Sequence, residues 1–144
     1  MFSMSRPWSR ACSSVLAASA LLSISAGHSY ADDAEAGLLA FNNHCRQCHS
    51  YKKDDNRLGP SLHGVVGRKA GTMQGFANYS DSLKNSKITW TEDQLDKWIT
   101  NPEALVPNNN MKPFPGVADA EQRKQIIAFL KSQSGAGDAK QSAK

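Results

Sequence analysis

Apolar residues recur at helical spacing in short segments of the chain, and long polar stretches separate these segments. The first segment, residues 34–44, places Gly37 and Phe41 on one face and follows Asp32 and Asp33, either of which can cap a helix. Strand-like alternation is too weak along the chain to predict a sheet, and no internal repeat is found. The pattern therefore favours an all-α fold.

Two further helices are predicted in the second half of the chain. Residues 91–100 are predicted to form a helix that either Thr89 or Thr91 can cap. The apolar side of this helix consists of Leu95, Trp98 and Ile99. The last helix is predicted from Asp119 to Ser132, and its apolar side consists of Ile126, Ile127, Phe129 and Leu130. We expect the first and last helices to pack crosswise, because Gly37 permits a close approach.

The stretches between the helices favour irregular structure. Residues 59–73 are rich in glycine and basic residues, and residues 101–116 contain four prolines and three consecutive asparagines, so no regular structure is expected there. Three helices of about 11 residues bury little apolar surface, and long loops are uncommon unless they serve a site. A flat apolar cofactor in the centre would supply the missing core.

The N-terminus has the pattern of a cleavable export signal. Arg6 and Arg10 precede an apolar stretch, residues 11–26, and Ser29-Tyr30-Ala31 places small residues at the cleavage positions. A membrane anchor is the alternative, but it needs roughly 18 to 20 apolar residues, and serines dilute this stretch. We expect a signal peptide at 1–31, a single folded domain at 32–133, a disordered tail at 134–144, and a periplasmic location.

Loss of the signal removes Arg6, Arg10 and no acidic residue, so the net charge falls from +4 to +2. So mild a balance, without a basic run carrying aromatics, gives no support for nucleic-acid binding. Cys45 and Cys48 are the only cysteines left. A disulfide between them would close a very small loop and constrain little, so another chemistry is expected to use them.

The segment Cys45-Arg46-Gln47-Cys48-His49 has the C-x-x-C-H pattern of c-type haem attachment. Its spacing lets both thiols form thioethers with one porphyrin, while His49 becomes an axial ligand of the iron. A thioredoxin-like redox pair and half of a zinc site remain alternatives. The first requires a βαβ context and the second requires two further ligands, and neither is evident.

With these motifs the chain resembles the class I c-type cytochromes, the monohaem carriers that include mitochondrial cytochrome c and its bacterial counterparts. The resemblance runs from about residue 37 to residue 131. It rests on an ordered set of motifs: Gly37 and Phe41 before the haem motif, then Gly59 to Gly64, Gly67 to Lys69, Ile88 to Trp90, Asn101-Pro102, Pro107 and Met111. The family fold is a small all-α domain around one covalently bound haem, with long loops.

The resemblance implies that Met111 is the second axial ligand, where a thioether favours ferrous iron. The alternative is that Met111 only fills space in the core. Pro60 matches a proline whose carbonyl accepts a hydrogen bond from the ligand imidazole of His49. The implied fold therefore brings three separate segments of the chain to the iron.

Four further residues match positions near the haem. Tyr79 and Trp90 match groups that hydrogen-bond a buried propionate, and Arg68 matches a guanidinium that compensates its charge. Trp90 as plain core and Arg68 as plain surface are the alternatives. Asn109 matches a polar position near the methionine sulfur, where a side-chain amide replaces the hydroxyl often found there.

Two departures from the mitochondrial pattern concern the distal side. Trp98 stands where a tyrosine commonly offers its hydroxyl to the methionine sulfur, and Leu83 replaces a frequent asparagine. Either an indole N–H replaces the hydroxyl or the contact is lost. These changes leave ligation intact but affect the distal hydrogen bonds and thus the reduction potential.

The implied function is that of a one-electron carrier, not an enzyme, because a His/Met-ligated iron has no open position. A haem enzyme or gas-binding sensor with a labile distal ligand is the alternative. Expected partners are redox proteins with acidic docking surfaces, with no nucleic acid, no membrane insertion after signal cleavage, and a monomeric state. The lysines that could steer such partners are Lys52, Lys53, Lys69, Lys84, Lys87 and Lys112.

Overall fold

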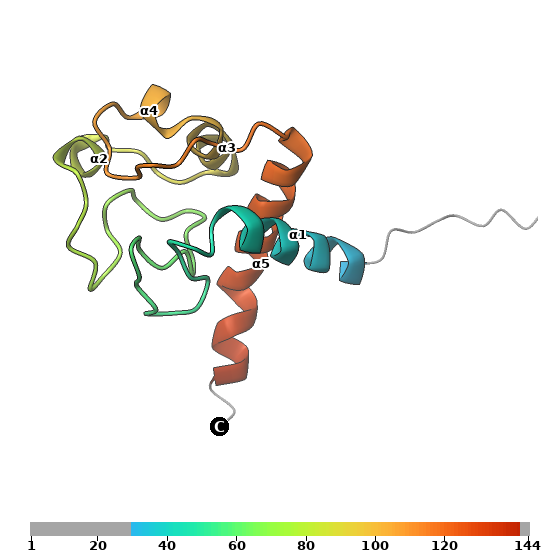
Figure 1. The fold of residues 1–144 in the computed structure, drawn as a ribbon. Helices are drawn as coiled ribbons and strands as arrows, with labels where there is room; N and C mark the ends of the chain where they lie inside the picture. The colour runs from blue at the N-terminus through green and yellow to red at the C-terminus, as the bar shows by residue number, and fades with distance from the viewer. Residues whose placement is uncertain (1–29, 142–144) are drawn as a thin grey trace, which may run out of the picture.

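The computed structural model describes residues 30–141 and contains no strand within that range, only helices joined by long loops (Figure 1). The helices are α1 (Tyr30–His44), α2 (Asp81–Asn85), α3 (Glu92–Thr100), α4 (Pro102–Leu105) and α5 (Ala120–Gln141). The predicted all-α class is therefore confirmed. The predicted signal peptide lies almost wholly outside the described residues and stays a prediction.

Helix α1 crosses α5 at a steep angle, and the loops and the three shorter helices gather on one side of this crossing (Figure 1). Phe41 and Ile126 are fully buried at the interface. The rings of Phe41 and Phe129 lie 5.6 Å apart, and Tyr51 from the following loop lies 5.5 Å from Phe41 and 5.2 Å from Phe129. The predicted pairing of the first and last helices is confirmed, with Tyr51 as an aromatic contributor that the helical pattern could not indicate.

Gly37 is the point of closest approach between α1 and α5. A Cβ at this position would lie 2.7 Å from the Cβ of Phe129 and 2.8 Å from the carbonyl oxygen of Gln125. Both atoms belong to the rigid part of α5, so neither can move without moving the helix. The glycine therefore sets the separation of the two helices.

We expect Gly37→Val to lower the free energy of unfolding by about 1–3 kcal/mol or more, because the added methyl groups overpack the interface. Thermal unfolding of the mature protein measures the effect. Leu39→Val is the matched control, since Leu39 lies on α1 but is 60% exposed. Equal melting temperatures for Gly37→Val and wild type would contradict the close approach.

Helix α3 agrees with its sequence pattern. The Thr91 hydroxyl caps it by accepting from the backbone N–H of Gln94 at 3.2 Å, and the buried residues are Leu95, Trp98 and Ile99, as predicted. The expectation that residues 101–116 lack regular structure is wrong at one place, because α4 forms there. The Asn101 side chain accepts from the N–H of Ala104 at 3.2 Å, and Pro102 follows at the first helical position, where it needs no hydrogen-bond donor.

Helix lengths also differ from prediction. Helix α1 begins at Tyr30 instead of residue 34, and the short α2, capped by Ser80, was not predicted. Helix α5 continues past Ser132 to Gln141, where the sequence predicted a disordered tail from residue 134. Alanine, lysine and glutamine favour helix, and extending an existing helix needs no new nucleus. The last three residues lie outside the described range.

Asp119 caps the start of α5. One oxygen of its carboxylate accepts from the backbone N–H groups of Glu121 at 2.8 Å and Gln122 at 3.2 Å. The N–H of Gln122, followed by that of Glu121, lowers the pKa of Asp119 below its ordinary value of 3.8. Because the folded-state pKa is lowered, the stabilisation is present above pH 4 and is lost as the pH falls through the folded value.

We expect Asp119→Ala to melt below wild type at pH 7 and to lose part of this difference as the pH falls through the lowered pKa of the wild-type carboxyl. Thermal unfolding at pH 7 and at a pH below that pKa measures it. Asp119→Asn is the control, since its amide oxygen still accepts but carries no charge. A difference that is the same at both pH values would contradict the role of the charge.

Candidate haem-binding site

The C-x-x-C-H segment forms a tight turn directly after α1. The N–H of Cys45 donates to the carbonyl of Phe41 at 2.8 Å, and the N–H of His49 donates to the carbonyl of Cys45 at 2.9 Å. Cys45 is buried, Cys48 is exposed, and both are free thiols. Burial, with a smaller contribution from Cys48, raises the pKa of Cys45 to about 12, so its thiol is protonated at neutral pH.

The ring of His49 is buried and held in one orientation. Its Nδ1 donates to the carbonyl of Pro60 at 2.8 Å, which leaves Nε2 as the nitrogen with the free lone pair. Burial lowers the pKa of His49, and the bond to Pro60 opposes this only in part. The imidazole is therefore neutral near pH 7, the form that binds a metal. This is the geometry expected for Pro60.

Gly59 packs against the face of His49, a contact that the sequence did not indicate. A Cβ on Gly59 would lie 2.7 Å from Nδ1 and 2.8 Å from Nε2 of the ring, and closer still to the carbon between them. The N–H of Gly59 also donates to the carbonyl of Cys48 at 2.8 Å. Any side chain at this position would displace the histidine.

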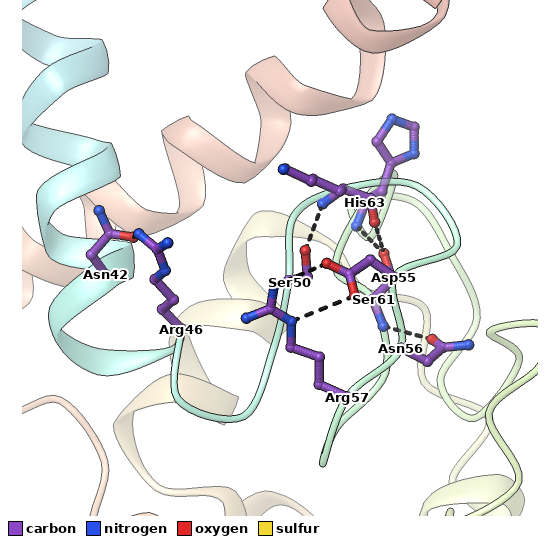
Figure 2. Close-up of polar contacts among 9 residues, drawn as sticks. Asn42, Arg46, Ser50, Asp55, Asn56, Arg57, Ser61 and His63 are labelled. Carbon is purple, nitrogen blue, oxygen red and sulfur yellow. Dashed lines mark hydrogen bonds and ion pairs between the residues drawn. The ribbon is translucent and has the colours of Figure 1, made fainter.

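The loop between His49 and Arg68 is cross-linked by side chains (Figure 2). The fully buried Ser61 donates through its hydroxyl to the carbonyl of Lys52 at 2.6 Å, and its N–H donates to the amide oxygen of Asn56 at 2.9 Å. The amide nitrogen of Asn56 donates to the carbonyl of Gln74 at 3.0 Å. These bonds fix the backbone that carries Pro60, and sequence reasoning missed the residues that form them.

Arg68 is half-buried against this loop. Its guanidinium donates to the carbonyls of Ser61 at 2.9 Å and His63 at 2.8 Å, and it lies 3.2 Å from the sulfur of Met73. Burial lowers the pKa of Arg68, which nevertheless remains charged at neutral pH. Arg68 is therefore bonded to the loop by its guanidinium, and its role beside a propionate stays a prediction.

Tyr79 and Trp90 are brought to the same side as Arg68. The Tyr79 hydroxyl accepts from the N–H of Met73 at 3.3 Å, and burial raises the pKa of Tyr79. Trp90 is anchored through its backbone N–H, which donates to the carbonyl of Arg68 at 2.9 Å. Its indole ring is buried, and its N–H makes no hydrogen bond among residues 30–141 and is not fully enclosed. This donor is free to bind an anionic group.

The distal segment places Met111 beside Trp98. The indole Nε1–H of Trp98 donates to the sulfur of Met111 at 3.1 Å. The indole N–H therefore replaces the tyrosine hydroxyl, and the contact with the sulfur is not lost. The rings of Trp98 and Trp90 are 5.2 Å apart, which links the distal side to the side of Arg68. Because the indole N–H is bonded to one lone pair of the sulfur, it fixes the direction of the second lone pair, which is left to bind a metal.

Asn109 bonds to the backbone of Met111 and not to its sulfur. Its amide nitrogen donates to a carboxylate oxygen of Glu103 and to the carbonyl of Val106, both at 3.0 Å, instead of to the methionine sulfur. Its amide oxygen accepts from the backbone N–H of Met111 at 2.9 Å. The amide thus lies beside Met111, and Glu103 and the loop backbone are the partners of its two ends.

The residues present fit a covalently bound haem. Two free thiols, a neutral imidazole against a glycine that leaves no room for a side chain, and an indole N–H without an acceptor are all found. In the part of the chain that the structure describes, no three His, Cys, Asp or Glu side chains gather to hold a metal ion, so the further ligands of a zinc site are not found there. None of the helices between residues 30 and 141 is long and apolar enough to cross a membrane.

Comparisons with known proteins agree with this chemistry. Residues 32–130 match the family model described as cytochrome c oxidase, cbb3-type, subunit III. The chain is 42% identical over 100 residues to cytochrome c of Euglena viridis, across 69% of this chain and 96% of that protein. It is 40% identical over 121 residues to cytochrome c2 of Blastochloris viridis, across 83% of this chain and 93% of that protein.

A solved structure, cytochrome cH from Methylobacterium extorquens, matches with a TM-score of 0.63 and 44% identity, over 69% of this chain and 98% of that chain. The residues matched by the family model, 32–130, include the segments that carry the site. The chain therefore belongs to the monohaem class I cytochrome c family, and it is an electron carrier with one covalently attached haem c, not an enzyme.

Proposed function

We propose that this chain carries single electrons between partner proteins outside the cytoplasm through an iron ligated by His49 and Met111. The observation that carries the proposal is the hydrogen bond from Nδ1 of His49 to the carbonyl of Pro60. It leaves Nε2 as the only metal-binding nitrogen of a buried, neutral ring that directly follows Cys48. A donor bonded in this way also binds iron more strongly, since the carbonyl increases the electron density on the ring.

When bound, the haem supplies the one-electron couple between ferric and ferrous iron. Cys45 and Cys48 hold it by adding their S–H groups across its two vinyl groups, which needs no oxidant. Met111 presents a sulfur that Trp98 orients by its N–H. With both axial positions of the iron taken by protein ligands, a substrate has no site at which to bind the iron. This ligand set therefore suits electron exchange and not a reaction of a bound substrate.

We assign Trp90, Tyr79 and Arg68 to a propionate of the haem. A carboxylate taken out of water must accept hydrogen bonds or be paired with a positive charge. Trp90 offers an indole N–H that makes no hydrogen bond among residues 30–141, Tyr79 offers its hydroxyl hydrogen, and Arg68 supplies a positive charge fixed by two loop carbonyls. Arg68 acts mainly as a nearby charge, because its Nη1 and Nη2 nitrogens already contact Ser61, His63 and Met73 of the loop.

The optical spectrum of the haem-loaded protein tests the proposal. We expect the oxidised form to be low-spin with the weak red band of sulfur bound to iron, and the reduced form to ignore CO at neutral pH. A high-spin, CO-reactive wild type would overturn ligation by Met111. The haem-attachment machinery is produced in the same cells. If the exported protein still remains free of haem, covalent attachment through Cys45 and Cys48 is overturned. Mass measurement of the exported protein tests cleavage before Asp32.

We further propose that redox partners dock through acidic surfaces onto the lysines of this chain. All six lysines named from the sequence are exposed, although Lys84 pairs with Asp81 at 2.7 Å and Lys112 pairs with Glu103 at 3.0 Å. Electron transfer with an anionic reagent such as hexacyanoferrate should then slow with rising salt. Lys87→Glu should slow it more than Lys124→Glu on α5, which changes the net charge equally. Equal effects of the two variants would remove the case for a localised docking face.

A further inference from the structure

Glu103, on the short helix α4, accepts hydrogen bonds from three donors of one loop. One of its oxygens accepts from the backbone N–H of Asn108 at 2.9 Å. The other accepts from the side-chain amide of Asn109 at 3.0 Å and pairs with the ammonium group of Lys112 at 3.0 Å. The three donors lie on both sides of Met111, so a single carboxylate holds the segment that carries the distal methionine.

Asn109 extends this contact to the backbone of Met111. Its side chain is buried, it donates to Glu103 and to the carbonyl of Val106, and it accepts from the N–H of Met111 at 2.9 Å. A continuous chain of hydrogen bonds therefore runs from the carboxylate of Glu103, through one amide, to the main chain of Met111. Linked bonds of this kind strengthen one another.

Glu103 is a firm anchor because α4 is itself fixed. Asn101 caps the helix, Pro102 is buried, and the N–H of Val106 donates to the carbonyl of Pro102 at 2.9 Å. The donors that hold the loop, that of Asn108 first and then that of Lys112, also lower the pKa of Glu103, so it is ionised at neutral pH. Hydrogen bonds to an ionised acceptor are shorter and stronger than neutral ones.

We propose that Glu103 is a positioning residue that keeps the Met111 loop closed and so sets the rate at which the methionine leaves the iron. This inference rests on the proposed ligation by Met111. Glu103 acts on Met111 through the loop, because its bonds go to Asn108, Asn109 and Lys112 and not to Met111 itself. Opening of the loop is a local unfolding event, and its cost depends on the bonds that the loop makes with its surroundings.

The rate of imidazole binding to the oxidised haem protein tests the proposal, because at saturating imidazole this rate is limited by the departure of Met111. We expect Glu103→Ala to raise the limiting rate roughly tenfold, as loss of hydrogen bonds to a charged acceptor implies. The limiting rate of Glu103→Gln should lie between those of wild type and Glu103→Ala, since one amide oxygen replaces the two acceptor oxygens of the carboxylate. Glu121→Gln is the control, because Glu121 pairs only with Lys124 on α5, at 3.9 Å, and should leave the rate unchanged. A Glu103→Ala rate within twofold of wild type would overturn the proposal.

A double-mutant cycle separates the hydrogen-bond chain from a general loss of stability. We expect Asn109→Ala to raise the rate as well, and the double variant to exceed the faster single variant only slightly, because both changes interrupt one chain of bonds. Effects that multiply would show two independent roles and overturn the chain from Glu103 to Met111.

Amide hydrogen exchange gives a readout that does not depend on iron ligation. In Glu103→Ala the N–H groups of Asn108 and Met111 should exchange faster, while that of Ile126 in the core of α5 should not change. Unchanged exchange at Met111 would overturn the positioning role even if ligation holds. If the wild type lacks the sulfur-to-iron band, the proposed ligation fails, and this exchange arm alone decides whether Glu103 holds the loop.

Discussion

Met111→Ala is expected to turn a low-spin protein that ignores CO into one that binds CO readily in its reduced form. The variant removes the thioether that Trp98 holds at 3.1 Å and leaves a methyl group that cannot ligate. His49, still fixed by Pro60, then binds the iron alone, and the opposite position is open to water or CO. The weak red band of sulfur bound to iron should disappear.

The reduction potential should fall in the same variant, because a thioether favours ferrous iron. A decrease on the order of 0.2 V is a modest part of the roughly 0.8 V range over which axial ligands set haem potentials. Redox titration with optical detection measures it. Trp98→Phe is the matched control, since it keeps the sulfur and removes only the N–H donor. It should keep the band and lower the potential far less, because the sulfur becomes only a slightly better electron donor. A Met111→Ala protein that keeps its band and ignores CO would show that another residue is the ligand.

Gly59→Ala should abolish most formation of the haem protein, although the change adds a single methyl group. That methyl would lie within 2.8 Å of both nitrogens of the His49 ring, too near for any rotation of the ring to relieve. The imidazole must then leave the carbonyl of Pro60 or push the loop away from Cys48, whose carbonyl is bound by the N–H of Gly59. Both movements misplace the residue that ligates the iron.

We expect the yield of haem-loaded Gly59→Ala protein to fall at least about tenfold, since the close approach required for ligation is lost. Haem absorbance per unit of exported protein measures the yield. Leu58→Ala is the control, because the neighbouring Leu58 is 76% exposed and lies away from the ring. A normal yield and spectrum for Gly59→Ala would mean that the loop can move aside and that His49 is less tightly held than the structure indicates.

Local patterns in the sequence predicted the features that neighbouring residues control. Helix α3 follows from its threonine cap and the spacing of Leu95, Trp98 and Ile99, and the haem attachment turn follows from the spacing of Cys45 and Cys48. The contact between Gly37 and the last helix was also predicted. Helical periodicity shows which residues share a face, even before the partner helix is known. Family resemblance, not periodicity, identified Met111 and Pro60.

Helix α4 and the direction of the Asn109 amide were not predicted. Prolines in residues 101–116 argued against regular structure, yet Asn101 as a cap and Pro102 at the first position form one helical turn. Asn109 has two donors and one acceptor, and the sequence could not show that Glu103, Val106 and Met111 would use them.

By itself, therefore, the sequence determined the three longer helices α1, α3 and α5, the attachment motif and the residue types that hold a haem. Only the tertiary structure decided which donor meets which acceptor, that Gly59 touches His49, and that Glu103 reaches the loop of Met111. The physical reason is that helix caps and periodicity act between residues a few positions apart. Hydrogen-bond directions and close approaches depend on how distant segments pack, to within fractions of an ångström.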